Sequence, residues 1–117
     1  MQTQTVLKLA GTMGLLAVAI GAFGAHGLEG RVEADLLEVF EVGARYHATH
    51  ALALLGLAPV APRLGRAGAV AAVAWTAGVV VFSGSLYALT LTGQRWLGAV
   101  TPIGGVSLMV GLSLIHI

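Results

Sequence analysis

Long apolar runs separated by short polar segments make up most of this chain. The runs at residues 9–28, 46–62, 67–94 and 96–117 contain no Asp, Glu, Lys or Arg. A helix that crosses a bilayer needs about 20 predominantly apolar residues. The pattern therefore predicts four transmembrane helices, at about residues 6–26, 45–61, 67–91 and 97–117.

The segment 31–45 has a different pattern, because acidic and apolar residues alternate with helical periodicity. Its apolar residues at helical spacing are Leu36, Leu37, Phe40 and Ala44. Glu41 and Arg45 form an i, i+4 pair in the favourable order. We expect an amphipathic helix at the membrane interface that leads into the second span. Anionic lipids would repel its acidic face, so it should pack against its own bundle or a partner.

Composition agrees with a membrane location. Of the 117 residues 57% are hydrophobic and 9% are charged, whereas a soluble domain usually has about 25% charged residues. The predicted fold is all-α, an integral membrane four-helix bundle that forms a single domain over residues 1–117. The net charge of +1 gives no basis for nucleic-acid binding, and the lack of cysteine excludes disulfides and thiolate metal sites.

Small residues recur in several predicted helices, where they would allow close approach of helix backbones in lipid. They are Gly14, Ala17, Gly21 and Ala25 in the first span, Gly78 and Gly84 in the third, and Gly104 and Gly111 in the fourth. A Gly- and Ala-rich composition alone can also produce such stripes. The first run resembles a signal peptide too, but its length and its small-residue face favour a retained span.

Orientation rests on six basic residues. With four spans both termini share a side, which holds Lys8, Arg63 and Arg66, whereas the other side holds Arg31, Arg45 and Arg95. The numbers tie, and the compact acid-free turn at Arg63 and Arg66 favours cytoplasmic termini. The chain ends with residues 113–117 (SLIHI) and has no polar anchor there, as a truncated or non-native terminus would, and no function is assigned to His116.

Polar side chains are densest at residues 41–50, where the acidic segment enters the second apolar run. His47 and His50 share a helix face, and His26 at the end of the first span is expected to face His50. Two or three imidazoles suit a divalent metal such as zinc, copper or nickel, and two can ligate haem. Quinone contact and proton relay are further alternatives. The simpler interpretation is that these histidines bond backbone carbonyls or hydroxyls of neighbouring helices.

Other polar residues also have two interpretations. Arg45 and Tyr46 fit membrane-edge anchors, and alternatively they could clamp a substrate carboxylate. Ser83 and Ser85 are expected to hydrogen-bond within or between helices rather than act as nucleophiles. Tyr87, like Trp96, fits an interfacial aromatic residue.

Four stretches together resemble a known family. They are residues 21–28 (GAFGAHGL), 46–54 (YHATHALAL), 82–87 (FSGSLY) and 101–105 (TPIGG). The chain resembles small four-span bacterial inner-membrane proteins that carry a domain of unknown function and have small mitochondrial transmembrane relatives in eukaryotes.

The resemblance implies a four-helix inner-membrane protein of unsettled activity. It places six polar or special residues on family motif positions: His26, His50, Ser83, Ser85, Tyr87 and Pro102. His47 falls where the family often has other polar residues. The C-terminal end departs from the pattern, because Gly111-Leu112 stands where a Gly-Trp pair is expected.

Two functional hypotheses follow. The first is a non-enzymatic binding, scaffold or assembly subunit that packs with itself as a homo-oligomer or with another membrane protein. The second is a redox-linked or ligand-binding protein that holds haem, quinone or a metal through His26, His47, His50 and Tyr46. Transport is weakly supported, because no charged residue lies in the middle of a span.

Overall fold

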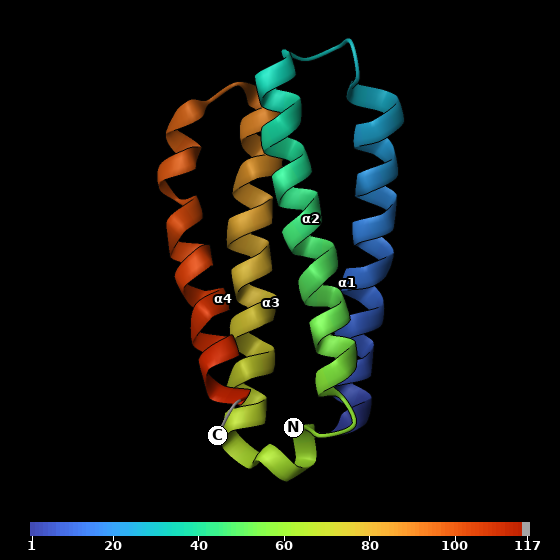
Figure 1. Cartoon of the computed structure of the whole chain (residues 1–117), viewed down its shortest axis with the longest axis vertical. Coiled ribbons are helices and arrows are strands. Elements are labelled where there is room, and N and C mark those ends of the chain that lie inside the picture. The colour runs from blue at the N-terminus through green and yellow to red at the C-terminus, as the bar shows by residue number, and fades with distance from the viewer. Residues whose placement is uncertain (116–117) are drawn as a thin grey trace.

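The computed structural model describes residues 1–115, in which four long helices run antiparallel to their neighbours (Figure 1). They are α1 (Thr3–Phe23), α2 (Ala34–Leu57), α3 (Ala61–Thr92) and α4 (Thr101–Ile115). The described part of the chain contains no strand, so the predicted all-α bundle is confirmed. The end of the predicted fourth span, including His116, lies outside the described residues.

The helices pack in chain order as an open row rather than a closed ring. Figure 1 shows α4, α3, α2 and α1 side by side from left to right. Within residues 1–115, α4 packs against α3 and its preceding turn but not against α1 or α2. The extents of 47 × 26 × 17 Å describe the same flattened shape. This arrangement leaves the space between α2 and α4 open over α3.

Short non-α segments connect the helices. A π-helical turn, η1 (Gly24–Leu28), extends α1, and a 3₁₀ turn, η2 (Arg95–Ala99), precedes α4. Pro62 lies in the first turn of α3. Its missing N–H is not needed there. Gly65 interrupts the start of α3 with φ 56° and ψ −129°, a conformation that only glycine adopts readily.

Three helical segments are long and apolar enough to cross a membrane: Thr3–Leu28, Ala61–Thr92 and Arg95–Ile115. The helix α2 is absent from this set of described segments because its first half carries the predicted amphipathic sequence. That half runs along the bundle in Figure 1 and buries Leu36 and Phe40. Since α2 packs between α1 and α3, His47 and His50 on its buried face have protein neighbours, whereas Glu38, Glu41 and Arg45 are exposed.

Glycine brings α3 and α4 into close contact. A Cβ atom at Gly78 would lie 2.6 Å from Leu108 Cδ2, and one at Gly111 would lie 2.6 Å from the Trp75 ring. Gly104 faces the backbone of Phe82, and a Cβ atom at this position would lie 2.8 Å from the Phe82 Cα. Three of the predicted packing glycines therefore lie where no side chain fits.

The other predicted packing residues are less enclosed. Ala17 is buried, and a Cβ at Gly14 would only reach Ala51, at 4.0 Å. Gly21 and Gly84 have open space around the Cβ position, and Ala25 is exposed. Much of the predicted stripe on α1 thus has room for a further neighbour such as a lipid chain.

The exposed surface is apolar and part of the interior is polar. Leu15, Val18 and Ile103 are 71%, 74% and 67% exposed, whereas His47 and Ser83 are 4% and 1% exposed. A bilayer solvates apolar side chains and leaves polar ones to find partners inside the protein. This distribution is the one expected for helices embedded in lipid.

Candidate functional site

Buried polar side chains line the contacts that α3 makes with α2 and α4. They are His47, His50, Ser83, Ser85 and Thr90. The first two come from α2 and the others from α3, whose small residues allow the helices to approach. The partners of these side chains decide whether the cluster is free to bind a ligand.

His47 reaches across from α2 to α3. Its Nδ1 lies 2.9 Å from the Tyr87 hydroxyl, and its Nε2 is buried without a hydrogen-bond partner in the described residues. His47 and Tyr87 also line a surface hollow of about 180 Å³, together with Met13 of α1 and Val80 of α3. Sequence reasoning did not anticipate the His47–Tyr87 contact, because a contact across 40 positions leaves no local signal.

His50 is held within its own helix. Its Nδ1 lies 2.7 Å from the Tyr46 carbonyl oxygen, so Nδ1 carries the proton and donates it. The imidazole stands edge-on to the Trp75 ring, at 6.4 Å between centroids. Tyr46 itself is half-exposed and contacts Phe82, at 4.9 Å between ring centroids. The simpler interpretation of His50, a bond to a backbone carbonyl, agrees with this geometry.

The hydroxyl groups of α3 join the helices. Ser83 Oγ donates to the Gly43 carbonyl at 2.7 Å, and Thr90 Oγ1 donates to the Leu36 carbonyl at 3.0 Å. Ser85 Oγ lies 2.6 Å from Thr101 Oγ1 and thereby connects α3 to the start of α4. Within residues 1–115 none of these hydroxyls is hydrogen-bonded to an imidazole, and their bonds hold helices together.

The structure does not bring His26 and His50 together, which corrects the expected pairing. Gly14 is the α1 residue beside Ala51, the neighbour of His50. His26 lies twelve residues beyond Gly14, about 18 Å along a helix, and it is exposed. Residues 1–115 contain no group of three His, Asp or Glu side chains placed to hold a metal ion.

Ion pairing also differs from the expectation. Arg45 is exposed and forms no ion pair with Glu41 in the described structure. Instead Arg95 Nη2 lies 2.9 Å from Asp35 Oδ2 and 3.4 Å from Glu33 Oε2. This contact joins η2, which precedes α4, to the start of α2 at the same end of the bundle. Sequence reasoning missed it because the partners lie 60 and 62 positions apart.

We expect Arg95→Gln to raise the pKa of Asp35. The hydrogen bond from Arg95 holds the pKa of this carboxyl below its ordinary value. The Asp35 contribution to stability is therefore present above the unfolded-state pKa and is lost as pH falls through the lowered folded-state pKa. Because the pair is exposed, the change in stability should be small. Carboxyl NMR titration measures the shift; Arg31→Gln is the control, and an unchanged Asp35 pKa in Arg95→Gln would contradict the assignment.

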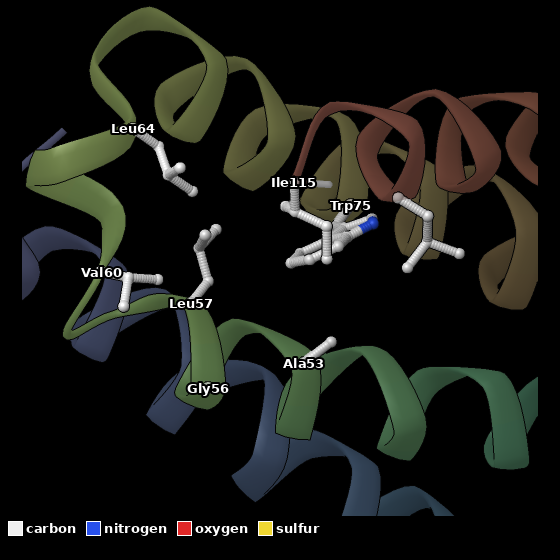
Figure 2. A pocket seen from close by; sticks show the side chains of 8 residues that line it. Ala53, Gly56, Leu57, Val60, Leu64, Trp75 and Ile115 are labelled. Atoms are coloured by element: carbon white, nitrogen blue, oxygen red, sulfur yellow. The ribbon is translucent and has the colours of Figure 1, made fainter. Parts of the chain in front are cut away.

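A cavity of about 500 Å³ lies between α2 and α4, with Trp75 of α3 at its base. Figure 2 shows Ala53, Gly56 and Leu57 of α2 on one side of it and Ile115 of α4 on the other. Val60 and Leu64 close the end at the α2–α3 connection. We call this cavity the α2–α4 groove. The sequence analysis missed it, and the only signal was one large aromatic residue in a run of Ala, Val and Gly.

Comparisons with known proteins agree on one family. The model of the family described as "Protein of unknown function (DUF423)" matches residues 20–105. The UPF0382 membrane protein YwdK of Bacillus subtilis is 46% identical over 86% of this chain and 84% of its own length. The UPF0382 inner membrane protein YgdD of Escherichia coli is 40% identical over 97% and 88%. A UPF0382 membrane protein of Haemophilus influenzae is 37% identical over 90% and 85%. No solved structure matches significantly.

Proposed function

Since the chain belongs to the DUF423 family of membrane proteins whose function is unknown, we propose that it is a non-enzymatic binding subunit of the inner membrane. The binding surface in this proposal is the α2–α4 groove. The termini and the Arg63–Arg66 turn face the cytoplasm. A ligand or a partner protein would bind at this groove.

The observation that carries the proposal is the contrast between the polar cluster and the groove. The buried Ser83 and Thr90 side chains donate to carbonyls of α2, and His50 bonds its own helix. By comparison the α2–α4 groove has a volume of about 500 Å³ and lies open on the protein surface. Pockets that bind small molecules typically have about 300–1,000 Å³. The groove is therefore available to a ligand, whereas the hydroxyl groups of Ser83 and Thr90 are already bonded within the bundle.

Gly56→Leu provides the test. A Cβ at Gly56 meets nothing within 4 Å, so leucine adds its side chain to the groove without disturbing the helix contacts. We expect mass spectrometry of the gently solubilised wild-type protein to detect a bound molecule that Gly56→Leu loses. Gly11→Leu is the matched control, because Gly11 on α1 also has open space at its Cβ position. A wild-type protein with nothing bound, or equal retention by both variants, would contradict the proposal.

The same samples test the second hypothesis. That hypothesis requires a stoichiometric Soret band or bound metal, abolished by His50→Ala. We expect a colourless and metal-free protein, because His26 is far from His50 along the bundle and His50 Nδ1 is engaged by Tyr46. A band or metal that depends on His50 would replace the binding-subunit proposal with a cofactor-based one.

A further inference from the structure

We propose that the α2–α4 groove binds an anionic phospholipid, with an acyl chain in the groove over the buried Trp75 and the phosphate at Arg63 and Arg66. This inference rests on the proposed function, which makes the groove the binding surface. It adds the chemistry of the ligand and assigns the two arginines a role in recognising its headgroup.

The apolar part of the ligand follows from the lining of the groove. All eight lining residues are apolar or carry only an indole N–H: Ala53, Gly56, Leu57, Val60, Leu64, Trp75, Leu112 and Ile115. A charged or strongly polar molecule would lose its hydration there without gaining partners. A hydrocarbon chain has no polar group to satisfy and fits such a surface. The bilayer supplies such chains at high local concentration.

The anionic part follows from the end of the groove. Val60 and Leu64 close the groove from the short α2–α3 connection, and Arg63 directly precedes Leu64. Arg66 follows the kink at Gly65. Both arginines are exposed, and the ion pairs of residues 1–115 involve neither of them. The guanidinium group is suited to phosphate because its planar donors can bond two oxygens at once.

The distribution of charge favours an anionic lipid over a neutral one. All five acidic residues lie between residues 29 and 41, at the other end of the bundle. The end with the groove carries Lys8, Arg63 and Arg66 and no acid. Basic residues at a membrane surface attract anionic lipids, each by roughly fivefold. A zwitterionic lipid also carries a phosphate, but its own headgroup cation offsets the attraction, so the basic residues favour a lipid with a net negative charge.

Fluorescence quenching of Trp75 tests the proposal directly. Trp96→Phe removes the only other tryptophan, which is 64% exposed at the opposite end. The variant is reconstituted in phosphatidylcholine vesicles that contain a minor share of acyl-brominated phosphatidylglycerol, or the same share of acyl-brominated phosphatidylcholine. Bromine quenches tryptophan only at short range. We expect the brominated anionic lipid to be enriched at Trp75 by roughly 25-fold over the zwitterionic one, since each of the two arginines contributes about fivefold.

Variants separate the two parts of the proposal. In the Trp96→Phe background, Arg63→Gln with Arg66→Gln should remove the preference for the anionic lipid, whereas Arg31→Gln at the other end should retain it. Gly56→Leu should reduce quenching by both lipids, whereas Gly11→Leu should not. High salt should weaken the preference if the headgroup is held by charge.

Other outcomes would overturn the inference in distinguishable ways. Equal quenching by both lipids that Gly56→Leu reduces would reject the anionic ligand while leaving the groove as a lipid-binding surface. A dimer in which neither lipid quenches Trp75 would identify a second copy as the occupant: the proposed binding surface would survive and the lipid would be rejected. A monomer in which neither lipid quenches would contradict both the inference and the proposed function.

Discussion

Alanine in place of Gly104 is expected to detach α4 from α3. A Cβ at this position would lie 2.8 Å from Phe82 Cα and 2.9 Å from the Gly78 carbonyl oxygen. Backbone atoms cannot turn aside as a side chain can, so the two helices must separate. We expect the free energy of unfolding to fall by about 3 kcal/mol, the upper part of the range for overpacking. Denaturant titration in detergent, followed by circular dichroism, measures the change.

Gly105→Ala is the matched control for this prediction. A Cβ at Gly105 would lie 3.7 Å from the Phe82 ring, an ordinary contact distance. Both substitutions exchange the same residue types in the same helix, so they share the gain in helix propensity of about 1 kcal/mol. Only the Gly104 variant should be destabilised. Equal effects would show that the backbone contact between α3 and α4 contributes little.

The four helices and the glycine contacts between α3 and α4 could be predicted from local patterns. Charge-free runs define the number of helices because bilayer thickness requires a minimum length. The heptad spacing of Gly104 and Gly111 indicates a close contact because both glycines then lie on one helix face. Such features depend on residues within one segment.

The arrangement of the helices and the polar contacts could not be predicted in the same way. The order of packing decides whether α4 touches α2, and no local pattern specifies it. The His47–Tyr87 contact and the Arg95–Asp35 pair join residues 40 and 60 positions apart. The expected His26–His50 pair failed because alternation of helix direction alone does not fix the relative depth of two residues. The neighbour of Ala51 on α1 is Gly14, far from His26.

Leucine in place of Ser83 is expected to force α2 and α3 apart. Ser83 is 1% exposed and donates to the Gly43 carbonyl at 2.7 Å. A Cβ at Gly43 would lie 3.4 Å from the Ser83 carbonyl oxygen, so the two backbones already approach closely. The larger side chain has no space, and we expect a loss of about 3 kcal/mol in the free energy of unfolding. The same denaturant titration in detergent measures it.

Two comparisons assign the cause of that loss and bear on function. Ser83→Ala removes only the hydrogen bond, whose contribution in membrane proteins averages about 0.6 kcal/mol. Gly84→Leu adds the same side chain one position later, where a Cβ meets nothing within 4 Å, and should be close to neutral. A loss in Ser83→Ala as large as in Ser83→Leu would contradict the packing explanation. If Ser83→Leu loses the most stability, the role of Ser83 is to allow close contact between α2 and α3. Binding in the α2–α4 groove should then survive in Ser83→Ala, because none of the residues that line the groove is altered.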